Sequence, residues 1–277
     1  MDLKSFLFTF QNEVRLYVFL AGFGLFALWE SFQPRRRLIA STPKRWLTNF
    51  ALAIGNSLLI RMTLPLIGIG AALAVEKQGW GLLKMLTLPG WQSFIVALLL
   101  LDIARYSQHV ALHKIPLLWR FHKVHHADVD YDCTTGLRFH PFEAFFSEGI
   151  LIIAIALIGP SPSAVLVFEI IYLFTGFLTH GNIGLPVRID SMVRLFLVTP
   201  DMHRVHHSSV LAETNSNYGG VLPWWDRLFG TYRAQPVAGH EGMTIGLDEY
   251  SDANALSYPH LLAMPFESKP GSAFRSD

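Results

Sequence analysis

Residues 91–126 read WQSFIVALLLLDIARYSQHVALHKIPLLWRFHKVHH. The first part of this stretch is almost wholly apolar, and a helix needs about 20 such residues to cross the hydrocarbon core of a membrane. The second part carries histidines at a dense and regular spacing: His109, His113, His122, His125 and His126. The stretch therefore predicts a membrane-spanning helix that continues directly into a histidine-rich segment.

The composition of the whole chain also favours a membrane protein. Of its 277 residues, 51% are hydrophobic and 16% are charged, whereas soluble domains carry about 25% charged residues. The net charge is +1, so we expect no nucleic-acid partner, because such a partner requires a basic surface. Cys133 is the single cysteine, which excludes an internal disulfide, a zinc site of the cysteine type and an iron–sulfur cluster held by this chain alone.

Four apolar runs are long enough to suggest membrane helices: residues 16–32, 47–75, 91–113 and 145–180. We expect Pro65 to kink the second run. The fourth run is interrupted by Gly-Pro-Ser-Pro at 159–162. Because proline and glycine end one helix and allow another to begin, we expect a helical hairpin there. The sequence thus predicts an all-α integral membrane helical bundle of about three spans plus a helical hairpin.

The distribution of positive charge predicts the orientation of this bundle. The loop after the first run is rich in lysine and arginine, at Arg35, Arg36, Arg37, Lys44 and Arg45, whereas the loop after the second run holds only Lys77 and Lys84. Loops rich in positive charge face the cytoplasm. We therefore expect residues 114–144 and 181–277 to lie on the cytoplasmic side, as a histidine-rich cap that holds a dimetal site.

Three histidine clusters are expected in this cap or at the span ends that open onto it. They are a His-x3-His pair at His109 and His113, and two His-x2-His-His clusters at His122, His125, His126 and at His203, His206, His207. Residues three and four apart on a helix share a face, so we expect each cluster to direct its imidazoles to one point. Imidazole is a common metal ligand, and eight histidines exceed what one ion accepts. The alternative, unrelated surface or core histidines, does not explain the repeated spacing.

Several further residues are candidates for the same site. We expect His180, at the end of the hairpin, to be a ninth ligand, with a helix-capping role as the alternative. Three interpretations of His140 remain open: a weak metal ligand, a residue that supports the ligands from behind, or a loop histidine. We expect no role in the site for His240 and His260. Metal-bound histidines usually donate their second ring N–H to a carboxylate or carbonyl. The candidates to support the ligands from behind, each with an ordinary boundary, turn or loop role as the alternative, are Asp102, Asn182, Glu143 and Asp201.

Five segments between Asp102 and Tyr232 resemble the sterol desaturase / fatty acid hydroxylase superfamily of membrane enzymes. The segments are LLWRFHKVHH at 117–126, RFHP at 138–141, TPDMHRVHHS at 199–208, and the pair NYG at 217–219 and WDRLFGT at 225–231. By this resemblance the chain divides into transmembrane helices and loops in 1–90, a catalytic domain in 91–235 and a polar tail in 236–277. The rings of Trp224, Trp225, Phe229 and Tyr232 are expected at the membrane interface.

The resemblance implies two iron ions held almost wholly by histidine, and oxidation of an unactivated C–H bond with O2. The ligands that it implies are His109, His113, His122, His125, His126, His180, His203, His206 and His207, with His140 as a weaker candidate. Many members carry a second histidine shortly after the equivalent of His180. Here Ile183 and Gly184 follow, so Asn182 is the candidate to complete the site through a water molecule.

The expected function is a lipid hydroxylase, with a lipid or sterol desaturase that uses the same site as the alternative. Its electrons are expected from an external donor of the ferredoxin, cytochrome b5 or flavin reductase type. Sterols, acyl chains, carotenoids, ether lipids and hopanoids all remain open as substrates. The expected location is the inner membrane of a bacterium or the endoplasmic reticulum of a eukaryote.

Two non-oxidative functions compete with this interpretation. A zinc hydrolase would keep three protein ligands and one open position for each ion, which the all-histidine set disfavours. A metal transporter or sensor would hold its ion near the middle of the bilayer, whereas these clusters gather at the span ends and in the cap.

Overall fold

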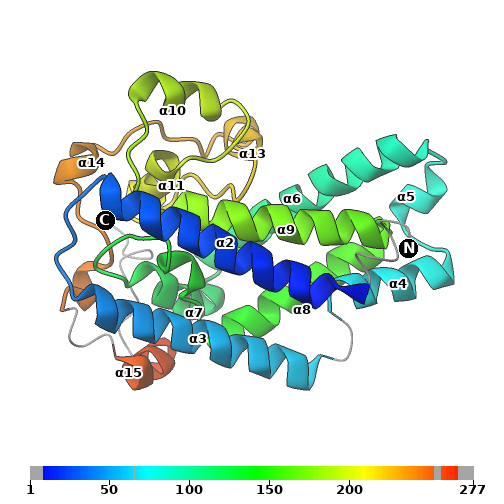
Figure 1. Cartoon of the computed structure of the whole chain (residues 1–277), viewed down its shortest axis with the longest axis horizontal. Helices are drawn as coiled ribbons and strands as arrows, with labels where there is room; N and C mark the ends of the chain where they lie inside the picture. The colour runs from blue at the N-terminus through cyan, green and yellow to red at the C-terminus, as the bar shows by residue number, and fades with distance from the viewer. Residues whose placement is uncertain (1–8, 65–66, 253–256, 268–277) are drawn as a thin grey trace.

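The computed structural model describes residues 9–64, 67–252 and 257–267. Within these residues the regular structure is helical, and the only extended pairings are two isolated bridges, Pro34 with Ile183 and Ser208 with Ile245. The predicted all-α class is therefore confirmed. Figure 1 shows long helices that lie side by side along one axis, with most of the short helices gathered at one end.

The helices divide into a bundle of the longer helices and a cap of mostly short ones. The bundle contains α2 (Gln11–Phe32), α3 (Thr42–Thr63), α4 (Ile69–Gln78), α5 (Leu82–Met85), α6 (Gly90–Lys114), α8 (Pro141–Ile158) and α9 (Pro162–His180). The cap contains α7 (Pro116–His126), η1 (Thr135–Leu137), α10 (Val187–Val193), α11 (Pro200–His206), α12 (Leu211–Thr214), α13 (Trp224–Leu228), α14 (Gly239–Gly242), η2 (Asp248–Tyr250), α15 (Tyr258–Ala263) and η4 (Met264–Phe266).

Four helices in the described residues are long and apolar enough to cross a membrane, namely α2, α6, α8 and α9. They correspond to the first and third predicted runs and to the two arms of the predicted hairpin. Less than half of the most apolar window of each helix is buried inside the fold, and exposed apolar faces on helices of this length are typical of membrane spans. The chain is an integral membrane protein.

The second predicted run, 47–75, is divided between α3 and α4, and neither helix is among the four. Helix α4 has 10 residues, which is too short to cross a bilayer. Helix α3 is long enough, but polar residues interrupt its apolar sequence. The side-chain amide of Asn49 donates to Thr134 (2.9 Å), and that of Asn56 donates to the carbonyl of Phe139 (2.9 Å). These polar residues hold the loop after α7. Pro65 lies outside the described residues.

The turn of the hairpin explains how α8 and α9 fit together. Gly159 ends α8 with φ +67 and lies against Gly81 and the carbonyl of Trp80, which a Cβ atom at this position would meet at 2.7 Å. Only glycine adopts this conformation in so little space without strain. Ser161 then caps α9 by accepting a hydrogen bond from the Ala164 N–H (3.2 Å), and Pro162 occupies the first turn.

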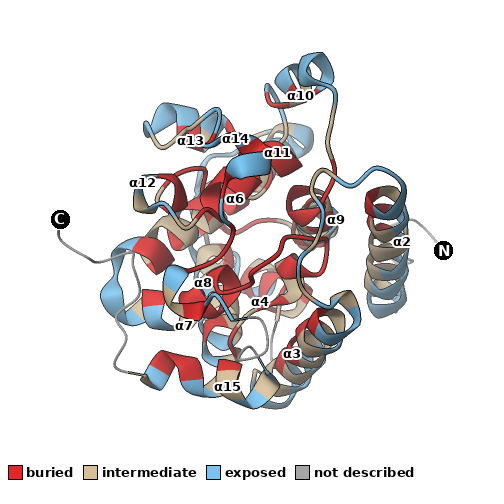
Figure 2. Cartoon of the chain, turned by 90° about the vertical axis from the view of Figure 1, so that its left-hand side faces the viewer, coloured by how far each residue is buried: buried red, intermediate tan, exposed pale blue. Residues whose placement is uncertain are grey.

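The bundle and the cap are two ends of one packed unit. Helix α9 packs against α2, α4 and α6, and α8 packs against α3 and α6. A core of buried apolar residues, among them Leu101, Ile155 and Phe168, fills the space between α6, α8 and α9. Viewed from the cap end, Figure 2 shows buried residues gathered in the centre, with the exposed faces of α2 and α3 at the edge.

A buried ion pair anchors the cap to α3. The guanidinium of Arg45 donates to both carboxylate oxygens of Asp128 (2.8 Å each) and to Asp132 (2.5 Å). Burial alone would raise the pKa of Asp128, but the charges of Arg45 and Arg138 lower it to about 2. The ion pairs with Arg45 therefore hold the beginning of the loop after α7 in a fixed position relative to α3.

Candidate metal centre

Nine histidines converge at the end of the bundle where α6, α7, α9 and α11 meet. They form two sets in which all the ligand nitrogens lie within 4.8 Å of one another. The five-histidine group consists of His109, His113, His122, His126 and His206. The four-histidine group consists of His125, His180, His203 and His207. These nine residues are the nine histidines that the sequence analysis selected, and each set could hold one metal ion.

Neither His-x2-His-His cluster points to a single centre, so this part of the expectation was wrong. His122 and His126 join the five-histidine group, while His125, between them, joins the other. In the second cluster, on α11, His206 joins the five-histidine group, while His203 and His207 join the four-histidine group. The reason is helical geometry. Adjacent residues on a helix point about 100° apart, so neighbouring histidines face different centres while residues four apart face the same one.

The spacing of the ligand nitrogens fits a metal ion in each group. The Nε2 atoms of His109 and His122 are 3.2 Å apart. Those of His125 and His203 lie 3.3 and 3.2 Å from Nε2 of His180. Two imidazoles bound to one ion at about 2.1 Å place their nitrogens roughly 3.0–3.4 Å apart.

Unpaired nitrogens support the same conclusion. In the described part of the chain, the Nε2 atoms of four of these histidines are buried and have no hydrogen-bond partner: His113, His126, His206 and His207. A buried polar atom without a partner costs about 1–3 kcal/mol, and that cost repeated within one small volume is explained if the nitrogens bind metal. Histidine is the donor type that suits iron, zinc or copper.

The histidines of the cap are held in the neutral form that binds metal. Burial, and secondarily the neighbouring imidazoles, lowers the pKa of five of them well below the usual value: His125, His126, His203, His206 and His207. A neutral imidazole keeps a lone pair for coordination.

Hydrogen bonds behind the ligands set which ring nitrogen is available. Nδ1 of His109 lies 2.8 Å from the carbonyl oxygen of Tyr218, and Nδ1 of His206 lies 2.7 Å from that of Ser216. By donating through Nδ1, each ring leaves Nε2 for the metal. These two partners could not be predicted from the sequence, because a backbone carbonyl has no side-chain signature, although the NYG segment at 217–219 marks the loop that supplies one of them.

Glu143 is the one proposed supporting residue that contacts a clustered histidine. Its carboxylate lies 2.6 Å from Nδ1 of His122, and both side chains are buried. Helix α8 begins two residues earlier, at Pro141, so the first turn of the hairpin positions this acid. The pair has the arrangement of a carboxylate that orients a metal-bound histidine.

Asp102 occupies a different position from the one expected. Its carboxylate accepts hydrogen bonds from the indole N–H of Trp225 (2.8 Å) and from the backbone N–H of Leu222 (3.2 Å). It therefore holds the loop before α13, rather than a histidine. The ring of Trp225, which we expected at the membrane interface, reaches inward to this carboxylate.

The other candidates also have partners outside the histidine groups. Asn182 exchanges two hydrogen bonds with the backbone of Arg36 (3.0 and 2.8 Å). Asp201 forms ion pairs with Arg35 and Arg204. Among the described residues, neither Asn182 nor Asp201 forms a hydrogen bond or ion pair with a histidine of the two groups, so neither is seen to support a ligand from behind.

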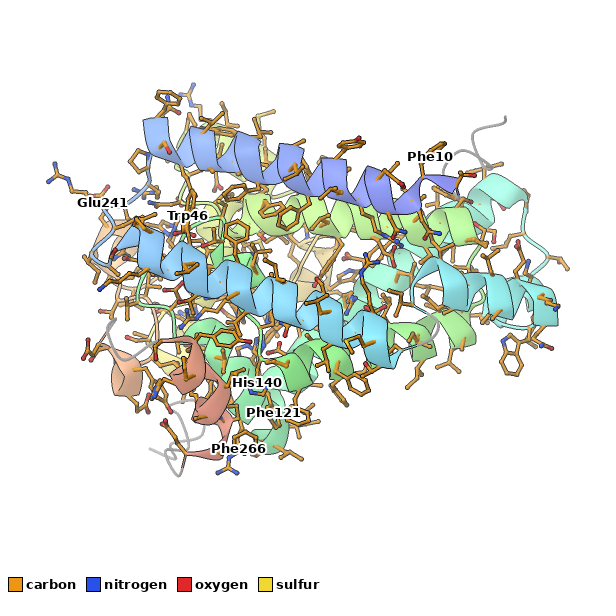
Figure 3. The ribbon with its side chains drawn as sticks, turned by 60° about the horizontal axis from the view of Figure 1, so that its bottom comes forward. Phe10, Trp46, Phe121, His140, Glu241 and Phe266 are labelled. Atoms are coloured by element: carbon orange, nitrogen blue, oxygen red, sulfur yellow. The ribbon has the colours of Figure 1, made fainter. Side chains whose placement is uncertain are left out.

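His140 lies apart from both groups. It caps α8 by accepting from the Phe142 N–H (3.1 Å), and Figure 3 places it beside Phe121 and Phe266. Of its three open interpretations, the structure therefore matches that of a loop histidine.

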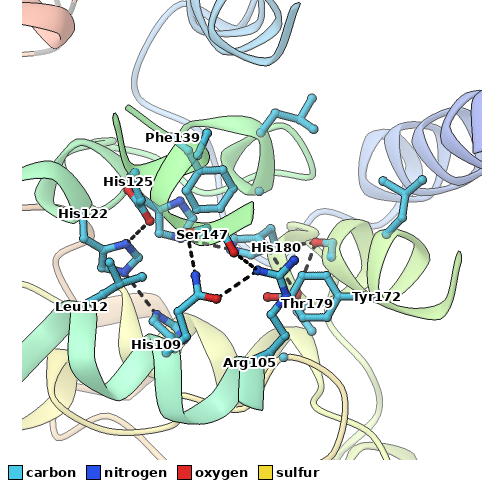
Figure 4. Close-up of a pocket in the computed structure, with 18 of the residues that line it drawn as sticks. Arg105, His109, Leu112, His122, His125, Phe139, Ser147, Tyr172, Thr179 and His180 are labelled. Atoms are coloured by element: carbon cyan, nitrogen blue, oxygen red, sulfur yellow. Dashed lines mark hydrogen bonds and ion pairs between the residues drawn. The ribbon is translucent and has the colours of Figure 1, made fainter. Parts of the chain in front are cut away.

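A cavity of about 290 Å³ adjoins both histidine groups. Figure 4 shows His109, His122, His125 and His180 along it. Its apolar walls come from Leu112, Leu137, Phe139, Leu173 and Phe177. The ring of Phe139 stacks on His125 with centroids 4.7 Å apart, which shields that side of the histidines from water. A single apolar space thus opens onto both candidate metal positions.

Comparison with known proteins identifies similar sequences. Residues 94–231 match the family model described as fatty acid hydroxylase. The ornithine lipid hydroxylase OlsE of Rhizobium tropici is 34% identical over 142 residues, which cover 51% of this chain and 42% of that protein. The alkylglycerol monooxygenase of Homo sapiens is 31% identical over 199 residues, which cover 69% of this chain and 43% of that protein.

A third relative is more distant. The cholesterol 25-hydroxylase of Homo sapiens is 26% identical over 145 residues, or 52% of each chain. The chain thus spans about two fifths of the length of the first two relatives and about half of the third. No solved structure matches it.

Proposed function

We propose that the chain is a member of the fatty acid hydroxylase family, whose model residues 94–231 match, and that it is a membrane lipid hydroxylase that uses O2. The observation that carries this proposal is the cavity between α6, α8 and α9, which contacts histidines of both groups. A lipid chain in that cavity would present a C–H bond to both metal positions at once. The rest of the lipid would remain among apolar helices.

We assign two iron ions to the two histidine groups. The five-histidine group would hold one ion and the four-histidine group the other. Bound iron supplies the redox chemistry with O2 that no side chain provides. All nine ligands lie between His109 and His207, which supports residues 91–235 as the catalytic domain, residues 1–90 as its membrane anchor and 236–277 as a tail.

The protein's own residues position the reactants and exclude water. The carbonyls of Ser216 and Tyr218 and the carboxylate of Glu143 fix three imidazole rings from behind. Leu112 and Phe139 form part of the apolar wall next to the histidines. Such a wall holds an alkyl chain in place and keeps bulk water from the reacting carbon.

Hydroxylation is favoured over desaturation by the relatives. Those reported above are named as hydroxylases or a monooxygenase. Their names also span an amino-acid lipid, an alkylglycerol and a sterol, so they do not indicate one substrate class.

The metal site is proposed to face the cytoplasm. Arg35, Arg36 and Arg37 follow α2 at the cap end of the bundle, and loops rich in positive charge stay on the cytoplasmic side. Electrons would then arrive from a cytoplasmic donor of the ferredoxin, cytochrome b5 or flavin reductase type. The corresponding membrane is the inner membrane of a bacterium or the endoplasmic reticulum of a eukaryote.

Mass spectrometry of membrane lipids tests the function. Cells that produce the wild-type chain are compared with cells that produce His206→Ala, and His260→Ala serves as the control because His260 lies outside both groups and pairs with Glu267. A lipid that gains one oxygen atom in the wild-type and control cells alone supports the hydroxylase. A lipid that loses two hydrogens instead would identify a desaturase.

A further inference from the structure

The cavity beside the histidines has one polar side, and it lies within the membrane-spanning helices. Arg105 and Gln108 come from α6, and Ser147 comes from α8. Figure 4 shows Arg105 and Tyr172 together, away from the apolar ring of Phe139, with Ser147 between them. Charged and polar side chains inside a span are costly and usually serve a function. An apolar lipid chain alone does not explain why this cavity contains an arginine.

The contacts of Arg105 fix its position but do not use all its donors. Its Nη1 donates to the side-chain oxygen of Gln108 (3.0 Å) and to the carbonyl of Ser147 (3.2 Å). The amide of Gln108 in turn donates to the Ser147 hydroxyl (2.6 Å). The guanidinium carbon lies 5.3 Å from the centre of the Tyr172 ring. The Nε of Arg105 is buried and has no partner in the described residues.

Arg105 forms no ion pair in the described residues, although its charge acts on the buried Glu169. The ion pairs of the described residues involve other arginines, at Arg15, Arg35, Arg45, Arg194 and Arg204. Three carboxylates in this region have other partners or form no ion pair with Arg105. Glu143 is hydrogen-bonded to His122, and Glu169 forms an ion pair with Arg15. Glu148 lines the cavity but forms no ion pair with Arg105. A guanidinium has five N–H donors, and the hydrogen bonds of Arg105 use only Nη1. Because Arg105 also lines the cavity, its guanidinium is suited to bind an oxygen atom of a ligand.

We propose that Arg105, held by Gln108 and Ser147, binds an oxygen atom of the lipid's polar head and so selects lipids that are oxidised next to that head. This rests on the proposed hydroxylase function and adds to it a substrate class and a position of reaction. The substrate is an alkyl chain joined to a hydrogen-bond-accepting head, such as an ether, ester or hydroxyl group.

The carbon atom that is oxidised follows from the spacing of Arg105 and His109 on α6. Arg105 precedes the ligand His109 by four residues on α6, which is a rise of about 6 Å. That distance corresponds to only a few carbon atoms of an extended chain. The cavity of about 290 Å³ is at the lower end of the range for ligand pockets. It accommodates a small head group and the first carbons of a tail, so the oxidised carbon is one of those first carbons.

Binding to the purified full-length chain is the first test. The two probes are 1-O-hexadecylglycerol and hexadecane, which share one alkyl chain and differ in the oxygen-bearing head. Native mass spectrometry from detergent micelles compares wild type, Arg105→Leu, Gln108→Leu and the control Arg61→Leu, which removes an exposed arginine of α3. Metal content and the melting temperature of each variant report whether it has folded.

We expect the wild type and Arg61→Leu to prefer hexadecylglycerol by about 10-fold or more, as a hydrogen bond to a charged group provides. Arg105→Leu should reduce that preference to roughly threefold or less, with Gln108→Leu between them. An unchanged preference in Arg105→Leu with wild-type metal content would overturn the proposal. If Arg105→Leu does not fold, the same criterion applies to Gln108→Leu.

The position of the added oxygen is the second test. Mass spectrometry of lipids from cells fed hexadecylglycerol should place the oxygen on the carbons next to the head. Hydroxylation of the carbon bonded to the ether oxygen gives a hemiacetal that breaks down to hexadecanal and glycerol, so hexadecanal counts as the oxygenated lipid formed at that carbon. Oxygen in the middle or at the methyl end of the chain would contradict the proposal while leaving the hydroxylase function intact. Absence of any oxygenated lipid with the wild type would instead contradict the hydroxylase function, and the binding preference would still decide whether Arg105 recognises the head.

Discussion

His126 and His207 stack with ring centroids 4.5 Å apart and an angle of 20° between the rings, although they belong to different histidine groups. The two candidate metal positions therefore share a wall of imidazole rings rather than standing as separate sites. Each of the two His-x2-His-His clusters contributes to both positions. Loss of one histidine is thus expected to disturb both ions, and effects of paired substitutions should not add.

Metal content should fall sharply when the four-histidine group loses a member. His207→Ala leaves three histidines there and also removes the ring that packs against His126. We expect about two ions per chain in the wild type and one or fewer in this variant, measured by elemental mass spectrometry of the purified protein. His260→Ala should retain both ions. Two ions in His207→Ala would show that this residue is not a ligand.

Glu143 should act on metal affinity through His122. Replacing it with glutamine keeps the shape but weakens the 2.6 Å contact with Nδ1. Loss of such a supporting carboxylate typically lowers metal affinity about 10- to 100-fold. Competition with a chelator measures this directly, with Glu241→Gln as the control because that side chain is 83% exposed. Equal affinities in the two variants would mean that the contact does not support the metal.

Asp102 should matter for stability and not for metal. Asp102→Ala removes the acceptor of the Trp225 indole and of the Leu222 N–H, which is expected to cost about 1–3 kcal/mol and to lower the melting temperature. Because Asp102 contacts no histidine of either group, the metal content of the folded protein should stay at the wild-type value. Trp225→Phe removes one of the same bonds, so the double variant should lose less than the two single losses combined.

The ion pair between Arg45 and Asp128 should make the cap sensitive to acid. The pKa of Asp128 in the folded chain is lowered to about 2 from an ordinary value of 3.8. A lowered carboxyl pKa stabilises the fold above the unfolded value, and this contribution is lost as the pH falls through the folded value. It amounts to about 2 kcal/mol.

A comparison with Asp128→Asn isolates this contribution. The difference in unfolding free energy between wild type and variant should be fully present above about pH 4 and should shrink towards pH 2. Urea unfolding in detergent, followed by tryptophan fluorescence, measures it at each pH. A difference that stays constant from pH 6 to pH 2 would show that the carboxylate charge of Asp128 does not stabilise the cap.

Much of the membrane fold was predictable because it depends on local sequence. The apolar run of α6 ends where the histidines begin, and Gly159 with Pro162 marks the turn between α8 and α9. The division of 47–75 into α3 and α4 was harder to predict. Its polar residues Asn49 and Asn56 bond to the loop after α7, and the position of that loop depends on the complete fold.

The metal site was predictable in its members but not in its arrangement. Spacing selects eight of the nine histidines, and His180 was selected by its place at the end of the predicted hairpin. Spacing does not determine which histidines of α7 share a centre with which histidines of α11, because that depends on how α7 is rotated against α11. The polar side of the cavity was missed for a similar reason. Arg105 is visible in the sequence, but its direction depends on the packing of α6 against α8 and α9.

Labelling with isotopic oxygen tests the central claim most directly. Membranes from cells that produce the wild-type chain, together with the host's soluble fraction as the source of electrons, are incubated under ¹⁸O2, and their lipids are analysed by mass spectrometry. The account predicts a lipid that carries one ¹⁸O atom, formed by the wild type and by His260→Ala and absent with His206→Ala. A product whose oxygen comes from water, or one formed equally with His206→Ala, would contradict it.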